Sequence, residues 1–312
     1  MFDASRRAAA RGLRRASRAL DRLAGRVHAP RWRPSAEDLA LVAQNAELRN
    51  HHAGRRAFVI GNGPSLRTHD LRPLASEVTF VANGFWRHPL MAAAERTSRA
   101  PWQPTFYTII DPLYFDGSAA LAACFETIRR RTPEVVFFVP ARKLPVIREQ
   151  GLLPMERVRP CIFRGTVVRD DPLPGDFSRP LPHLQSVSLM GLLGALYTGC
   201  DPIYLIGMDH DWLSRPIIRC NHFYREVSVA GHPTFQAIER EGSETYLDNL
   251  EGMSTLYRMY YKVADLAAAL GVRILNASRG GYLDVFARAD YEDVVPQAVG
   301  PEAEDTARAV RV

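Results

Sequence analysis

Residues 57–66 have the sequence AFVIGNGPSL, in which four apolar residues run directly into a glycine-rich turn. A short apolar run of this length is typical of a strand that is buried on both faces of a sheet. The two glycines allow a tight turn, and Pro64 followed by Ser65 suits the first positions of a helix. The stretch therefore predicts a buried strand, a turn and the start of a helix, in that order.

Similar apolar runs and helical patterns alternate along most of the chain. Further strands are expected at residues 78–82, 105–110, 134–139, 203–206 and 272–275, and helices at residues 35–48, 186–197 and 244–270. Short apolar strands separated by helical stretches favour a parallel sheet that is covered on both faces. We therefore predict an α/β fold with a doubly wound, mostly parallel, Rossmann-like sheet in a single main domain.

Composition divides the chain of 312 residues into three parts. Residues 1–34 are a basic arm with the apolar stripe of an amphipathic helix, residues 35–295 form the main domain, and residues 296–312 are expected to be a flexible tail. Within the main domain, residues 151–185 contain six prolines and are predicted to form an irregular excursion over the sheet. The four cysteines show no CxxC pair, which favours reduced thiols over a zinc site or a disulfide framework.

The formal net charge of +6 is unevenly distributed. Residues 1–34 contain ten arginines and two aspartates, a net charge of +8, so the rest of the chain carries −2. The main domain has no basic face, and we expect no nucleic-acid partner. The arm is suited to an anionic membrane surface; docking onto a partner protein and a transit peptide are the alternatives. Because no apolar run is long enough to span a bilayer, the expected location is the cytoplasm, peripheral to the inner membrane face if the arm binds lipid.

Small and polar residues follow nearly every expected strand. They are residues 61–65, Asn83, Asp111, residues 207–211 and residues 276–278. Because the carboxyl ends of parallel strands lie at one edge of a sheet, these residues are expected to surround one ligand site. The free N–H groups and the dipole of a helix that starts at Pro64 attract phosphate, so a nucleotide is the expected ligand. The turn is not GxGxxG and Asn83 replaces a ribose-binding carboxylate, which disfavours a dinucleotide.

Three segments carry a resemblance to known families. The sequence VIGNGPSL at residues 59–66, followed by a strand that ends in Asn83, resembles the start of bacterial sialyltransferases that use CMP-sugars. It also resembles the related domain of archaeal 6-hydroxymethylpterin diphosphokinases and flagellin-modifying motility accessory factors. Residues 186–209 and 271–293 are similar to later parts of the same families, so the resemblance covers roughly residues 55–293 and leaves out the arm.

The resemblance implies roles for individual residues. Asn62 and Ser65 would contact the nucleotide phosphates or ribose, Asn83 would hold the donor or the base, and the turn at residues 186–191 would pack against the nucleotide. Such transferases need no metal, because tyrosines and backbone donors stabilise the leaving phosphate, and Tyr224 is the best match for that role. Together with the strand-end residues, the expected nucleotide-binding set is Gly61, Asn62, Gly63, Ser65, Asn83, Asp111, Ser186, Ser188 and His210.

The catalytic base is where this chain departs from the family. The sialyltransferases place a histidine close before the long helix, and residues 241–244 here contain none. A base must take a proton from an acceptor hydroxyl, which favours a histidine or a carboxylate with a shifted pKa. His222 is the first choice, and Asp209 or Asp211 the second, since alternate residues of an extended chain point to the same side.

Three functions follow from these observations. The leading one is a glycosyltransferase of cell-surface polysaccharide synthesis, which moves a sugar from a CMP-activated, sialic-acid-like donor to a glycan or glycolipid acceptor without a metal or other cofactor. The second is a diphosphokinase that transfers diphosphate from ATP to a pterin-like alcohol; it requires Mg²⁺, for which Asp111, Asp209 and Asp211 are the available carboxylates. The third is a non-catalytic nucleotide-binding module that docks a partner through the arm.

Overall fold

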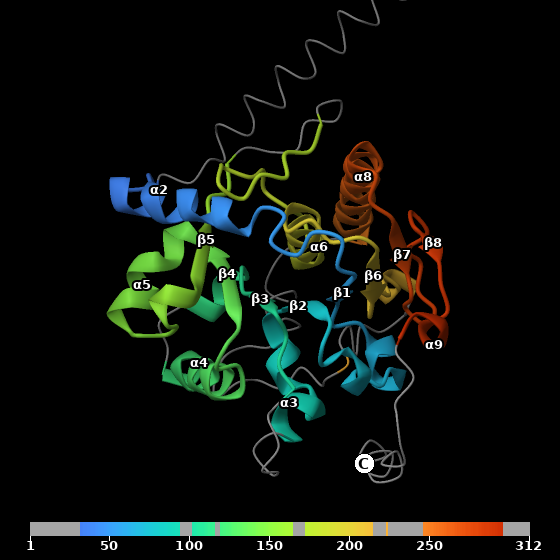
Figure 1. The fold of residues 1–312 in the computed structure, drawn as a ribbon, viewed down its shortest axis with the longest axis horizontal. Coiled ribbons are helices and arrows are strands. Elements are labelled where there is room, and N and C mark those ends of the chain that lie inside the picture. The colour runs from blue at the N-terminus through green and yellow to red at the C-terminus, as the bar shows by residue number, and fades with distance from the viewer. Residues whose placement is uncertain are drawn as a thin grey trace, which may run out of the picture.

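The computed structural model describes residues 32–93, 102–115, 119–164, 172–214, 223 and 246–295. Eight parallel strands form one sheet in the order β5-β4-β3-β2-β1-β6-β7-β8 (Figure 1). The strands are β1 (Ala57–Ile60), β2 (Val78–Ala82), β3 (Phe106–Thr108), β4 (Val136–Pro140), β5 (Val158–Cys161), β6 (Ile203–Ile206), β7 (Ile274–Asn276) and β8 (Ala287–Arg288). The described helices are α2 (Ala36–Ala43), α3 (Pro89–Ala93), α4 (Ala119–Arg131), α5 (Leu144–Glu149), α6 (Val187–Tyr197), α8 (Tyr246–Leu270) and α9 (Tyr291–Val294).

Both faces of the sheet are covered, as the apolar strands require. Alternate residues of β1 belong to different cores: Phe58 and Ile60 pack with α4 and α5, whereas Val59 packs with α6 and α8. Figure 1 shows α4 and α6 on opposite sides of the sheet. The prediction of a doubly wound, parallel α/β domain is confirmed.

Most of the expected elements are present, with small shifts in their ends. Strands at residues 57–60, 78–82 and 203–206 have the predicted bounds, and the expected helix at residues 35–48 is α2 followed by a 3-10 helix (Gln44–Leu48). Ser35 caps α2 in a reciprocal capping box with Asp38. Among the described helices, none combines the length and the apolar character needed to cross a membrane.

The prediction of an irregular excursion over residues 151–185 is wrong in one part. Residues 158–161 form β5, which pairs with β4 at the edge of the sheet. Pro160 lacks an N–H donor, and its presence argued against a strand. An edge strand tolerates proline because one of its sides needs no ladder hydrogen bonds.

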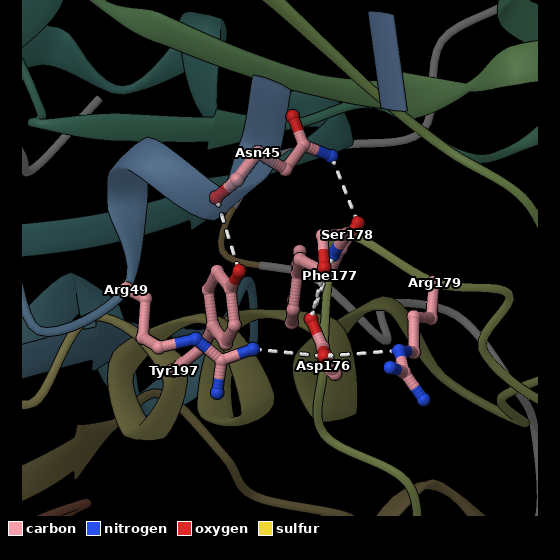
Figure 2. Close-up of polar contacts among 7 residues, drawn as sticks. All are labelled: Asn45, Arg49, Asp176, Phe177, Ser178, Arg179 and Tyr197. Carbon is pink, nitrogen blue, oxygen red and sulfur yellow. Dashed lines mark hydrogen bonds and ion pairs between the residues drawn. The ribbon is translucent and has the colours of Figure 1, made fainter. Parts of the chain in front are cut away.

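The remainder of that segment, residues 172–185, is also held in place. The buried side-chain nitrogen of Asn45 donates hydrogen bonds to the carbonyl oxygens of Pro160 (2.8 Å) and Phe177 (3.0 Å). The main-chain carbonyl oxygen of Asn45 accepts a hydrogen bond from the hydroxyl of Tyr197, at 3.1 Å (Figure 2). Asn45 therefore ties the segment to β5 and to the end of α6.

Three predictions cannot be compared with the fold. Residues 1–31 of the basic arm and the tail at residues 296–312 lie outside the described residues, as do the expected catalytic residues His222 and Tyr224. Cys124, Cys161 and Cys200 are free and buried, as expected; Cys220 is also outside the described residues.

Helix α6 packs closely on the sheet through two glycines. A Cβ atom at Gly191 would lie 2.8 Å from Cγ1 of Val59, and one at Gly194 would lie 3.0 Å from a ring carbon of Phe80. Because α6 is buried along nearly its whole length, a larger side chain there has no solvent side to turn to. The glycines therefore set the height of α6 above β1 and β2.

We predict that Gly191→Ala is less stable than Gly252→Ala, its matched control on α8. Both changes gain helix propensity, but a Cβ at Gly252 would meet only Gln185, at an ordinary 3.7 Å. Overpacking at Gly191 should lower the free energy of unfolding, relative to the control, by about 1–3 kcal/mol. Urea denaturation of the two variants measures this difference, and equal stabilities would contradict the packing described.

Candidate functional site

The site lies where the strand order reverses. Strand β1 has β2 on one side and β6 on the other, and in open α/β sheets ligands bind at the carboxyl ends of strands beside such a reversal. A pocket of about 480 Å³ opens there. Its lining includes ten of the eleven expected site residues that the structure describes: Gly61, Asn62, Gly63, Asn83, Asp111, Ser186, Ser188, Asp209, His210 and Asp211.

The loops after β1 and β6 are in direct contact. The N–H of Gly61 donates to the carbonyl of Ile206 at 2.7 Å, and the N–H of Gly63 donates to the carbonyl of Gly207 at 2.9 Å. A Cβ atom at Gly63 would lie 2.6 Å from the carbonyl oxygen of Gly207 and 2.5 Å from the Asp209 carboxylate. Gly61 and Gly63 were predicted to bind the nucleotide, but the group that approaches both of them in the structure is the loop after β6.

Ser65 is the expected site residue that does not line the pocket. Its N–H donates to Oδ2 of Asp209 at 2.7 Å, and its hydroxyl donates to the other carboxylate oxygen. The helix that follows is a 3-10 helix of five residues, Pro64–Thr68. The prediction that this helix offers a free N–H group to phosphate is therefore wrong at Ser65, because Asp209 already occupies it.

Asp209 is a buried carboxylate, with 4% of its surface exposed. Burial raises its pKa above the ordinary value, and the two hydrogen bonds from Ser65 act in the opposite direction. Asp111, Asp209 and Asp211 line the same pocket. In the described part of the chain, no group of three His, Cys, Asp or Glu side chains is placed to hold a metal ion, so the structure does not assemble these three aspartates as a magnesium site.

Two asparagines leave hydrogen-bond acceptors unused beside the pocket. Asn62 donates from its side-chain nitrogen to the carbonyl of Ala82 at 3.0 Å, and Asn83 accepts the Tyr107 hydroxyl on its backbone carbonyl at 2.6 Å. The side-chain oxygen of each is buried and has no donor within the described residues. Buried polar atoms nearly always have a partner, so these two oxygens beside the pocket are acceptors whose partner is not among the described residues.

Backbone strain occurs at the same place. Asn83, which follows β2, has a φ of +44°, and His210, in the loop after β6, has a φ of +48°. Residues other than glycine rarely adopt positive φ, and such conformations cluster at functional sites. Both residues line the same pocket.

His210 is held by helix α8. Its Nε2 atom lies 2.8 Å from the hydroxyl of Tyr260, a fully buried residue. Burial lowers the pKa of His210 to about 4, although the neighbouring Asp211 charge acts to raise it. The ring is therefore neutral near pH 7, and its Nδ1 atom makes no hydrogen bond to another described residue.

Other lining residues were not anticipated from the sequence. Tyr114, Gln185 and Trp212 also face the pocket. Each lies within three residues of a predicted site residue, so a search of the positions flanking the strand ends and the α6 cap would have found them.

Comparisons with known proteins were made for the whole chain. No protein-family model matches it, and no curated protein matches it in sequence. Among solved structures, the sialyltransferase CstII from Campylobacter jejuni in complex with CMP-3FNeuAc is similar with a TM-score of 0.42 and 10% identity, over 75% of this chain and 85% of that one. The sialyltransferase CST-II with a trisaccharide acceptor and CMP is similar with a TM-score of 0.33 and 11% identity, over 76% and 86%.

We predict that the difference in unfolding free energy between Asp209→Asn and the original chain shifts in favour of the variant as the pH rises. A carboxylate whose folded-state pKa is raised stabilises the fold only while protonated, so its contribution falls as pH increases above the unfolded value of about 4. Urea denaturation between pH 4 and pH 8 measures the difference between the two proteins. Asp265→Asn, on the exposed side of α8, controls for the loss of one charge. If the difference in unfolding free energy between Asp209→Asn and the original chain did not depend on pH, the burial argument would be contradicted.

Proposed function

We propose that the chain is a glycosyltransferase that moves a sugar from a CMP-activated donor to a hydroxyl of a glycan or glycolipid, without a metal ion. The observation that carries the proposal is the pocket at the reversal of the sheet, with two buried asparagine oxygens that have no donor. The choice of cytidine rests on the resemblance of residues 59–66 and 186–209 to CMP-sugar transferases.

The asparagines suit the nucleoside part of the donor. A cytosine amino group and ribose hydroxyls are hydrogen-bond donors, and Asn62 and Asn83 offer acceptors from the ends of two adjacent strands. A bound nucleoside would satisfy both oxygens, which otherwise stay buried at a cost in free energy. The same two residues were expected at this position from the sequence.

The phosphate is best placed at the start of α6. Ser186 caps this helix of eleven residues, and Ser186, Val187 and Ser188 all line the pocket. The N-terminus of an α-helix presents N–H groups and a partial positive charge to an anion. The 3-10 helix after β1 is a weaker choice, because the N–H of Ser65 already donates to the Asp209 carboxylate at 2.7 Å, whereas the N–H of Ser188 donates to the neutral hydroxyl of Ser186 at 3.2 Å.

His210 is the base that we propose from the described residues. The acceptor hydroxyl attacks the anomeric carbon of the donor, the bond from that carbon to the CMP oxygen breaks, and the base takes the hydroxyl proton. The neutral ring of His210 can donate from Nε2 to the Tyr260 oxygen and accept this proton at Nδ1. Its lowered pKa keeps the ring neutral at pH 7 and makes it a weaker base than a solvated histidine. His222 remains a competing prediction, and Tyr224 remains the prediction for the residue that stabilises the leaving phosphate.

We predict that CMP binds the chain and that Asn83→Gly weakens binding about tenfold, the cost of one hydrogen bond to a buried acceptor. Glycine adopts positive φ without strain, so this change removes the carboxamide and keeps the backbone. Asn50→Gly is the matched control, since Asn50 has a φ of +57° and does not line the pocket. Isothermal titration calorimetry measures all three affinities.

The outcomes of that titration separate the alternatives. Failure of every cytidine nucleotide to bind would contradict the proposal, and so would equal effects of Asn83→Gly and Asn50→Gly. Magnesium-dependent binding of ATP in place of CMP would favour the diphosphokinase.

We predict that His210→Asn lowers kcat by about 10²–10⁴ while CMP affinity stays unchanged, because a general base acts on the proton and not on the nucleotide. The assay is release of CMP from CMP-sialic acid in the presence of glycan acceptors. The exposed His51→Asn is the control. Full activity of His210→Asn together with loss of activity in His222→Asn would contradict the proposal for His210 and identify His222 as the base.

A further inference from the structure

A second pocket of about 310 Å³ adjoins the first. The two pockets share a wall made by Asn83, Asp111 and the residues at the start of α6. The second pocket extends from this wall past the ends of β3 and β4, where Ile110 and Pro140 line it. A molecule that fills the first pocket can therefore continue into the second.

Arg142 is the charged residue that distinguishes this second pocket. It belongs to a short 3-10 helix, Ala141–Lys143, directly after β4, and its side chain is half-buried. Other arginines of the described domain reach carboxylates: Arg56 pairs with Glu77 and Arg49 with Asp176. Arg142 has neither an ion pair nor a hydrogen bond within the described residues, although it lines a cavity.

Among the described residues, the neighbours of Arg142 supply no counter-charge through an ion pair or a hydrogen bond. Partial burial and the charge of Arg142 lower the pKa of His183, which lines the same pocket, so that ring is neutral near pH 7. Asp111 lies in the shared wall of the two pockets. A half-buried guanidinium with no partner among the described residues is able to bind an anion, and its planar set of donors matches a carboxylate or a phosphate.

We propose that the second pocket is a subsite in which Arg142 binds an anionic group, a carboxylate or a phosphate, carried by a substrate of the transfer reaction. The inference rests on the proposed function, because that function places the donor nucleotide in the first pocket. The charge complements an acidic group on the donor sugar or on the acceptor, and these two sources are separable by experiment.

Inorganic phosphate is the probe for this subsite. Isothermal titration of the full chain, saturated with CMP, should show phosphate binding that Arg142→Gln weakens about tenfold or more. Arg142→Lys should retain part of the affinity, since it keeps the charge and loses the paired donors. Arg258→Gln, on an exposed part of α8, should match the original chain, and CMP affinity should be equal in all four proteins.

A second titration identifies the source of the anion. With CMP-3FNeuAc in place of CMP, loss of phosphate binding assigns the subsite to the acidic donor sugar, and persistence of phosphate binding assigns it to the acceptor. Phosphate binding that is absent from the original chain, or unchanged in Arg142→Gln, while CMP still binds, would overturn the subsite. Failure of CMP itself to bind would instead contradict the proposed function.

Discussion

The contact between the loops after β1 and β6 is the constraint on which the site depends. Backbone hydrogen bonds join Gly61 to Ile206 and Gly63 to Gly207, and the Asp209 carboxylate closes the contact on Ser65. A side chain at either glycine of the first loop would meet a carbonyl oxygen at under 3 Å. The two central strands are thereby joined in a fixed register at their carboxyl ends, and the pocket opens beside this junction.

This contact determines which hydrogen-bond donors and acceptors of the pocket remain available to a ligand. Asp209 occupies the N–H of Ser65. The other helix N-terminus that lines the pocket is that of α6, where the N–H of Ser188 donates to the neutral hydroxyl of Ser186. The acceptors of Asn62 and Asn83 lie beside the same pocket, and His210, supported by Tyr260, lies beyond Asp209 in the same loop. In the proposed function, the nucleoside, the phosphate and the base lie along this pocket, and Arg142 lines the adjoining one.

The sequence was informative where burial alone decides structure. Strands β1, β2 and β6 are buried on both faces and appear as apolar runs, so their bounds and the strand-end residues Asn83 and Asp209 could be predicted. Strand β5 could not, because an edge position made Pro160 acceptable. The contact of Ser65 with Asp209 joins residues 144 positions apart, and no local pattern specifies such a pair. That Arg142 has no partner among the described residues likewise depends on tertiary packing, in a chain where arginine is common.

A crystal structure with CMP bound would show directly whether the nucleotide occupies the pocket at the carboxyl ends of β1, β2 and β6. The account predicts the nucleotide in the pocket between β1, β2 and β6, with an N–H or O–H group about 3 Å from a carboxamide oxygen of Asn62 or Asn83. It also predicts the phosphate at the N-terminus of α6. A nucleotide bound elsewhere, or one whose phosphate displaces Asp209 from Ser65, would contradict it.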